Sequence, residues 1–389
     1  MGVAARVNKK RIWGRWVSIG IAAVLLGGLF VNGQTAVNAQ EGARTSNAQV
    51  SAQPTAKPGI KQETKKVKVG NKSFTVQTVR IPKGTPVTVR LVKNPVGSTE
   101  AFASIVKNYR AEAAINGAFF EAYGGPPDPY GMLIANGELI HKGGYGTTIG
   151  FKKDGTAIMD SLRATLTGTV VSPEGKSMGW YATFLNRVPA EGSSTSILFT
   201  PARGSKVGFT GGIAVTVDDG KVVKNEVNAN AVIPDNGFVL VFTGTQKSTA
   251  ERFAIGSEVN LQLTYKDAQD QPLPEWEDVV TGAGAGPRLV KDSKVALNAA
   301  EEGFNDSKIL TASAARSGIA IMQDGSIMLA TVPGATMKQW ADIMKALGAK
   351  QAMNLDGGAS SAMYSGGKIV TPAGRLLSNT LVFGSSLNK

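Results

Sequence analysis

The sequence predicts an α+β fold with a mixed, largely antiparallel sheet core, a few helices and a β-rich insertion. Many short runs are rich in Val, Ile, Thr and Phe, which favour strands. Asn-Gly and Asp-Gly pairs, typical of two-residue hairpin turns, separate several of these runs and lie at 136–137, 154–155, 219–220 and 324–325. Only two segments show clear helical periodicity, so helices are expected to be the minority.

The folded region is expected to begin with strands at Val67–Val69, Phe74–Ile81 and Val87–Val92. A helix is predicted over 99–109, because its apolar residues recur at helical spacing and share one face. A strand over Ala113–Ile115 should follow, and then a hairpin that pairs Met132–Ala135 with Glu138–His141.

The middle of the chain is strongly β, which predicts an insertion near 160–270 with strands at 156–171, 178–188, 195–200, 212–218, 221–227, 237–243 and 257–265. A hairpin pairing Gly318–Met322 with Ile327–Val332 follows. A helix capped by Thr336 should end at Gly348, since Gly favours the left-handed residue that stops a helix. Short strands at 351–355 and Thr380–Phe383 complete the prediction.

The N-terminus has the pattern of a secretory signal peptide. A basic segment precedes the apolar run Val17–Val31, and Val37-Asn38-Ala39 offers a small-residue cleavage site. The run is shorter than the roughly 20 residues of a membrane span. Secretion without a stable membrane span is therefore expected, with an N-terminal membrane anchor as the alternative. Polar composition predicts that residues 40–66 form a disordered linker, leaving 67–389 as the domain.

Composition excludes several classes of site. The chain has no Cys and one His, His141, so thiolate zinc sites, disulfides and Cys nucleophiles are excluded. The net charge is +13, and loss of the five basic residues in 1–39 would leave about +8. This charge suits an anionic cell-surface polymer or a phosphate-bearing substrate. Nucleic acid is not expected as a partner, because no basic run with interleaved aromatics occurs.

The stretch from Gly348 to Gly367 is the strongest candidate for a site. Asn354 and Asp356 share one face of the predicted strand at 351–355 and reach the edge of a sheet together. Gly357 and Gly358 then allow a sharp turn or a close approach by a ligand. The hydroxyls of Ser360 and Ser361 follow. A polar turn stabilised by Asp356 itself is the structural alternative.

Five segments together resemble the phosphodiester glycosidase family over about residues 70–385. They are Asn116–Phe120, the Gly-rich run to Gly286-Pro287, Ala315-Arg316-Ser317, Asn354–Ser361, and Arg375 with Asn379. Ala118, Ala285 and Ala359 stand where Gly is common in the family, which puts a tighter approach of the substrate in doubt. Bacterial members often carry names that refer to exopolysaccharide biosynthesis.

The resemblance implies cleavage of a sugar-1-phosphate diester at the anomeric carbon, on a cell-envelope or extracellular glycan. Positive charge on the sugar ring then needs a carboxylate, and charge on the leaving phosphate needs Arg or N–H donors. The implied catalytic residues are Asp356 as carboxylate, Arg316 as phosphate clamp, and Asn116. The implied substrate-binding residues are Asn354, Gly357, Gly358, Ser360, Arg288, Arg375 and Phe120.

Several roles stay open at this point. Phe119 is expected to stack on the sugar or to lie in the core, and Glu121 or Asp128 is a candidate second carboxylate. His141 is a candidate proton donor or a solvent-facing residue. No cofactor or metal site is assigned, although Asp356 and Asn354 have oxygen ligands of the kind that Ca²⁺ prefers. A non-catalytic carbohydrate-binding or scaffold protein in exopolysaccharide production is the alternative function.

Overall fold

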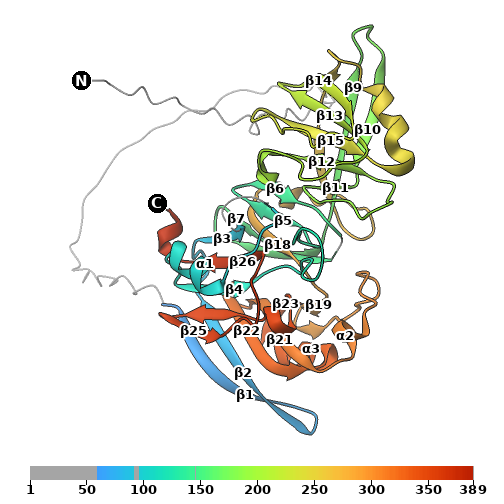
Figure 1. Ribbon diagram of the computed structural model, residues 1–389. Coiled ribbons are helices and arrows are strands. Elements are labelled where there is room, and N and C mark those ends of the chain that lie inside the picture. Colours follow the sequence, from blue (N-terminus) through green and yellow to red (C-terminus); the bar gives the residue numbers. More distant parts are fainter. Residues whose placement is uncertain (1–58, 92–95, 145, 389) are drawn as a thin grey trace, which may run out of the picture. The chain divides into compact units, whose positions relative to one another are not determined.

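The computed structural model describes residues 59–91, 96–144 and 146–388 (Figure 1). Residues 58–389 form one compact unit. The predicted signal peptide, 1–39, and the linker up to residue 58 lie outside the described residues. Within the described part of the chain, strands assemble into four sheets, and almost all strand pairs are antiparallel.

The seven-stranded sheet carries the predicted site stretch. Its strand order is β1 (Lys61–Val69), β2 (Lys72–Ile81), β22 (Ile327–Ala335), β21 (Ala314–Met322), β23 (Ala349–Asn354), β19 (Arg288–Lys291) and β20 (Lys294–Val295). Helix α3 (Met337–Ala346) packs Trp340 and Ile343 against one face, together with Ala352 of β23. Met353 and Leu355 alternate to the other face and join the main core.

Two five-stranded sheets pack around that main core, which buries Ile115, Ile149 and Leu381. The β4 sheet has the order β25 (Lys368–Thr371), β24 (Met363–Ser365), β4 (Ala113–Asn116), β26 (Asn379–Phe383) and β3 (Val87–Leu91). Helix α1 (Phe102–Asn108) covers its other face. The β18 sheet has the order β6 (Glu138–His141), β5 (Leu133–Ala135), β18 (Val279–Gly284), β7 (Thr147–Lys152) and β8 (Ala157–Ser161).

A nine-stranded sheet forms the insertion lobe, which has its own apolar core around Trp180, Leu240 and Phe253. Its strand order is β10 (Ser177–Ala182), β9 (Arg163–Val171), β16 (Glu258–Val259), β14 (Lys221–Val227), β13 (Ile213–Asp218), β15 (Gly237–Phe242), β12 (Ser196–Phe199) and β11 (Phe184–Leu185), with β17 (Gln262–Lys266) beside β9. The short helices are α2 (Ser307–Leu310), η2 (Pro201–Arg203), η3 (Gly244–Arg252), η4 (Pro274–Trp276), η5 (Gly358–Ser360) and η6 (Ser385–Asn388).

The fold is mostly β, so it has more strand than the α+β prediction suggested, while the antiparallel sheets and the few helices agree with it. The expected hairpins form; at Asn136-Gly137, both residues have positive φ, 53° and 78°. Thr336 caps α3 with a capping box, and Gly348 has a φ of 85°. One boundary differs from the prediction: β1 starts at Lys61, so 61–66 is a strand and not linker.

Candidate active site

Asp356 lies in the turn that follows β23. Its backbone N–H and its carbonyl oxygen both form hydrogen bonds with residues at the end of β4. Its N–H donates to the carbonyl oxygen of Gly117 (3.0 Å). Its own carbonyl oxygen accepts a hydrogen bond from Nδ2 of Asn116 (2.7 Å). Because both partners come from a central strand of the β4 sheet, the carboxylate is fixed by two sheets at once.

Two buried asparagines tie three segments together at this point. Asn116 also accepts a hydrogen bond through Oδ1 from the N–H of Ala362 (2.9 Å), so its amide links β4 to the chain beyond the turn. Asn379 accepts a bond from the N–H of Ala118 (2.7 Å) and donates to its carbonyl oxygen (3.2 Å). A Cβ on Gly117 would lie 2.2 Å from Oδ1 of Asn379, so only glycine fits there. Both amides position the Asp356 turn.

The carboxyl group of Asp356 has an unusual protonation equilibrium. Burial raises its pKa to about 6, against opposing effects of the Ser360 hydroxyl, the Gly357 N–H and the charge of Arg375. The Gly357 N–H donates to Oδ1 at 2.9 Å. Ser360 is buried, and its hydroxyl makes no hydrogen bond of good geometry within the described residues. A carboxyl with such a pKa is half ionised at about pH 6 and mostly ionised at pH 7, and catalytic carboxyls often have perturbed pKa values.

Arg316 lies beside this turn and has no acidic partner among the described residues. A Cβ on Gly357 would lie 2.9 Å from the Ala315 carbonyl oxygen and 3.9 Å from Cδ of Arg316. The guanidinium donates only to carbonyl oxygens, through Nε to Ala335 (2.9 Å) and through Nη2 to Ala312 (2.7 Å). Burial lowers the pKa of Arg316, and no carboxylate offsets this effect. A buried, unpaired guanidinium favours the binding of an anion.

Unpartnered polar atoms gather around the same turn. Asn354 donates through Nδ2 to the Gly286 carbonyl oxygen (3.0 Å), but its Oδ1 is buried without a hydrogen bond to any described residue. The hydroxyls of Ser317, Ser360 and Ser361 are also buried without a hydrogen bond to any described residue. Gly358 has a φ of 58°. Since buried polar groups normally have partners, this concentration indicates a place for a polar ligand.

An open pocket of about 620 Å³ begins close to the turn, and Phe120, Tyr123, Ala359 and Arg375 are among its lining residues. Arg375 donates through Nη2 to the Tyr123 hydroxyl (2.9 Å), and its guanidinium lies 5.0 Å from the centre of that ring. Its positive charge also lowers the pKa of Asp356. The pocket therefore extends the candidate site away from Asp356.

Residues 211–384 match the family model described as phosphodiester glycosidase. The resemblance to this family is confirmed. The matched residues include Arg316, Asn354, Asp356 and Arg375, whereas Asn116 and Phe120 lie before them. A search of curated proteins found no match.

Solved structures show where this fold occurs elsewhere. A hypothetical protein from Synechocystis has a TM-score of 0.73 and 24% identity, over 83% of this chain and 62% of that one. This chain thus spans less than two thirds of that protein's length. A protein described as exported, from Burkholderia pseudomallei, has a TM-score of 0.64 and 22% identity, over 80% and 74% of the two chains.

A third similar structure is the zebrafish N-acetylglucosamine-1-phosphodiester alpha-N-acetylglucosaminidase catalytic domain, described as auto-inhibited by its pro-peptide. Its TM-score is 0.48 and its identity 14%, over 84% of each chain.

Five other candidates, Arg288, Phe119, Glu121, Asp128 and His141, lie outside the immediate surroundings of Asp356. Arg288 donates to Oε1 of Gln351 (2.7 Å) and to the Met159 carbonyl oxygen, so its side chain is engaged elsewhere. Phe119 packs against Phe304, with ring centres 5.9 Å apart, and adjoins the main core. Glu121 accepts a hydrogen bond from the Tyr130 hydroxyl (2.6 Å), which lowers its pKa.

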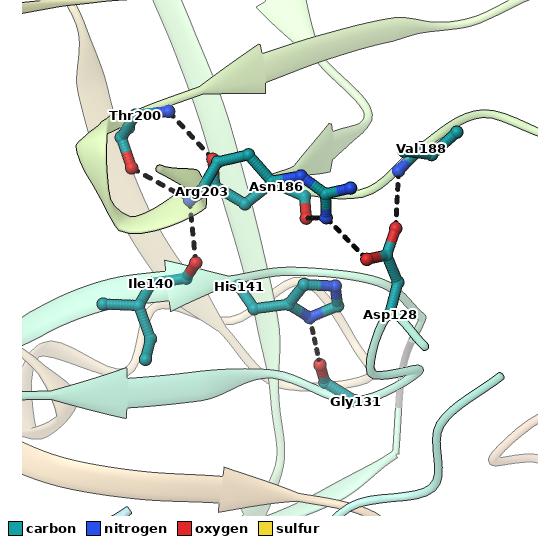
Figure 2. A network of polar contacts seen from close by, with 8 residues as sticks. All are labelled: Asp128, Gly131, Ile140, His141, Asn186, Val188, Thr200 and Arg203. Carbon is teal, nitrogen blue, oxygen red and sulfur yellow. Dashed lines mark hydrogen bonds and ion pairs between the residues drawn. The ribbon is translucent and has the colours of Figure 1, made fainter. Parts of the chain in front are cut away.

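Asp128 and His141 belong to a buried network between the loop before β5 and the insertion lobe (Figure 2). Asp128 forms an ion pair with Arg203 (2.5 Å) and accepts a hydrogen bond from the Val188 N–H (2.8 Å). His141 lies 2.8 Å through Nδ1 from the Gly131 carbonyl oxygen, so this nitrogen carries the proton. Burial lowers the pKa of His141 to about 3. It is neutral and does not face solvent, and both residues stabilise the fold.

Two residues near the site were missed by sequence reasoning about function. Asn379 was noted only as part of the family resemblance, and Tyr123 was not singled out. The Pro-Gly-rich loop around Tyr123 was the available signal, because an aromatic residue in such a loop has little chance of burial.

No group of three His, Asp or Glu side chains suited to a metal ion occurs in residues 59–91, 96–144 and 146–388. Over the same residues, no helix has the length and apolar composition to cross a membrane.

Proposed function

We propose that this protein is a secreted hydrolase that cleaves a sugar-1-phosphate phosphodiester at the anomeric carbon, on a cell-envelope or extracellular glycan. One observation carries the proposal: the carboxyl of Asp356, with its raised pKa, belongs to a turn that packs against the side chain of Arg316, whose buried guanidinium has no acidic partner among the described residues. The match of residues 211–384 to the phosphodiester glycosidase family supports the same reaction class.

The reaction divides charge between two places, and the site has a group for each. The bond between the anomeric carbon and the phosphate oxygen breaks, and the phosphate leaves with the electron pair. Ionised Asp356 stabilises the positive charge that develops on the sugar, as a nucleophile or by its field. Arg316 and the backbone N–H of Gly358 stabilise the charge on the departing phosphate. Water completes the reaction by adding its hydroxyl to the anomeric carbon.

Substrate binding in this proposal uses the unpartnered atoms around the turn. Oδ1 of Asn354 and the hydroxyl of Ser360 are buried acceptors or donors suited to sugar hydroxyls. Arg375 and Phe120 contribute from the adjoining pocket. Asn116 acts through the main chain of Asp356, because both halves of its amide are engaged by backbone groups. Arg288 has no assigned contact with substrate, since its hydrogen bonds lie elsewhere.

Export is part of the proposal. The basic segment, the apolar run Val17–Val31 and the small-residue site at Val37-Asn38-Ala39 support a cleaved signal peptide. The positive net charge of the remaining chain suits an anionic glycan at the cell surface.

The test measures free sugar released by the purified protein from UDP-GlcNAc and from synthetic hexose-1-phospho-6-hexose diesters. Asp356→Asn should lower the turnover number by at least about 10³-fold, because the neutral amide cannot stabilise the developing charge. Arg316→Lys, which keeps the charge but loses the planar fork, should lower kcat/KM by about 10–100-fold.

Arg80→Lys, in the exposed ion pair between Arg80 of β2 and Asp324, is the matched control and should leave turnover unchanged. Full turnover by Asp356→Asn would sink the hydrolase proposal. Tight binding of the diesters without release of sugar by the wild-type chain would instead support a non-catalytic carbohydrate-binding protein.

A further inference from the structure

Tyr123 is the most exposed large hydrophobic residue among the described residues, with 87% of its surface accessible. It lies in the loop between β4 and β5, which also contains Gly124, Gly125 and three prolines. A lone exposed aromatic needs no explanation by itself. This one is notable because its orientation is fixed by several contacts.

The ring of Tyr123 is held from both ends. Its hydroxyl accepts a hydrogen bond from Arg375 (2.9 Å), whose guanidinium lies 5.0 Å from the ring centre. Its backbone N–H donates to Oε1 of Glu121 (3.1 Å), and the other oxygen of Glu121 accepts from Tyr130 (2.6 Å). The ring is thus fixed in advance, so a ligand that stacks on it loses little further side-chain entropy.

The base of the same loop is anchored inside the molecule. Asp128 carries the buried ion pair with Arg203 and the hydrogen bond from Val188, both from the insertion lobe (Figure 2). The N–H of Glu121 donates to the carbonyl oxygen of Asp128 (3.0 Å), which closes the loop on itself. These contacts hold the loop that carries Tyr123 in place, unlike a surface loop that has no such contacts.

The pocket beside Tyr123 has the size and chemistry for a sugar ring. Its volume is about 620 Å³, and it combines the aromatic side chains of Phe120 and Tyr123 with the charged groups of Glu121 and Arg375. Gly124 and Gly125 leave it open, since a Cβ on either would meet no atom within 4 Å. Aromatic faces with nearby hydrogen-bonding groups suit pyranose rings, which have an apolar C–H face and a polar edge.

We propose that this pocket is a subsite for a second pyranose ring, stacked on Tyr123 and hydrogen-bonded to Arg375. It is a different ring from the one that is cleaved, because Asp356 is not among the residues that line the pocket. Ala359 and Gly374 connect the two places through a backbone hydrogen bond of 2.7 Å. The assignment of the cleaved ring rests on the proposed function, whereas binding at Tyr123 does not.

The test compares two probes by isothermal titration calorimetry on the full chain carrying Asp356→Asn, which prevents turnover. One probe set is hexose-1-phospho-6-hexose diesters with glucosyl, galactosyl, mannosyl and N-acetylglucosaminyl donors. The other set has the same donors as methyl phosphodiesters, which lack the second ring. Adding Tyr123→Ala should weaken binding of the two-ring diesters about tenfold and that of the methyl esters less than about twofold.

Tyr123→Phe, which keeps the ring but loses the bond to Arg375, should weaken the two-ring diesters only about two- to threefold. Tyr181→Ala, an exposed tyrosine of β10 in the insertion lobe, is the control and should change nothing. If no probe pair shows a Tyr123-dependent difference, the subsite is rejected.

The two proposals fail separately. Tyr123-dependent binding of two-ring diesters, without release of sugar by the wild-type chain, would keep the subsite and reject the hydrolase. Release of sugar with a KM that Tyr123→Ala leaves unchanged would keep the hydrolase and reject the subsite.

Discussion

At the scale of single residues, Asp356 and His141 are two buried titratable groups with opposite consequences. Burial raises the pKa of Asp356 to about 6 and lowers that of His141 to about 3. In both cases burial favours the neutral form, which is the protonated carboxyl of Asp356 and the deprotonated imidazole of His141. Asp356 lies among polar atoms that have no hydrogen bond within the described chain, close to an open pocket, whereas His141, at the end of β6, is fully buried and bonded to Gly131. Only Asp356 is placed to act on a ligand.

These two residues predict a pH dependence of stability. The folded pKa of Asp356 exceeds the unfolded value near 3.8, so its contribution is greatest below pH 4 and is lost as pH rises through 6. The folded pKa of His141 lies below 6.5, so its contribution is present above pH 6.5 and is lost as pH falls. Asp356→Asn should therefore exceed the wild type in free energy of unfolding by about 1–2 kcal/mol at pH 7, after discounting for partial exposure.

Below pH 4 the two proteins should be equally stable, and between pH 4 and 6 the variant should lose stability with falling pH more steeply. Urea unfolding at a series of pH values measures both effects. Parallel stability curves for the two proteins from pH 4 to 7 would show that Asp356 has an ordinary pKa.

The sequence predicted Asp356 better than it predicted its neighbours. A carboxylate after a short strand, followed by two glycines, is a local signal. Arg288, after the Gly-rich run, had a weaker local signal; a β-bulge between Arg288 and Val290 changes the register there, and its side chain bonds to Gln351 and Met159. Nothing near Asn379 in the sequence shows that it binds Ala118, because that contact spans 261 residues.

At the scale of elements, turns were predictable where backbone geometry demands particular residues. Asp-Gly pairs mark the hairpins β7–β8, β13–β14 and β21–β22, and the glycine of each pair has a positive φ. The start of β1 was not predictable, because residues 61–66 are exposed on both faces and carry no apolar pattern. Helix α2 is too short for periodicity to reveal it.

The loop between β4 and β5 depends on the insertion lobe for its conformation. Arg203→Met leaves the Asp128 carboxylate buried without its charge partner, which should lower the free energy of unfolding by about 3–5 kcal/mol. It should also increase amide hydrogen exchange in residues 121–130 more than in the rest of the β18 sheet, because Asp128 anchors that loop. Urea unfolding and hydrogen-exchange mass spectrometry measure the two effects.

Arg80→Met is the matched control, since it breaks the ion pair with Asp324 on an exposed surface and should cost less than about 1 kcal/mol. Equal costs for the two substitutions, or uniform exchange across the loop and sheet, would show that the buried pair does not brace the loop.

At the scale of the whole molecule, the candidate site is assembled from segments far apart in the chain. Asn116 bonds to Asp356 and Ala362, and Asn379 bonds to Ala118. Local patterns predicted the strands but not the four sheets or their strand orders, because partners such as β2 and β22 are separated by most of the chain. The family resemblance indicated which segments are expected to form the site, but it did not predict the strand orders.

The N-terminal boundary of the folded unit can be tested directly. A chain starting at Pro58 should unfold in urea with the same midpoint and slope as the full chain, because the compact unit begins there. A chain starting at Val67, the boundary expected from the sequence, loses most of β1 and the hydrogen bond from Thr78 to Glu63 (3.1 Å). It should be less stable by roughly 1–3 kcal/mol. Identical stability of the two truncated chains would show that residues 58–66 contribute nothing.

The position of β26 has a consequence for synthesis on the ribosome. This strand, Asn379–Phe383, is the last in the described chain, yet it lies between β4 and β3 inside the β4 sheet. Until it emerges, β4 lacks a neighbour and the Asn379 amide cannot reach Ala118. A nascent polypeptide therefore cannot complete the candidate site around Asp356, even when the preceding segments have folded, and translation products that terminate before this strand should be inert.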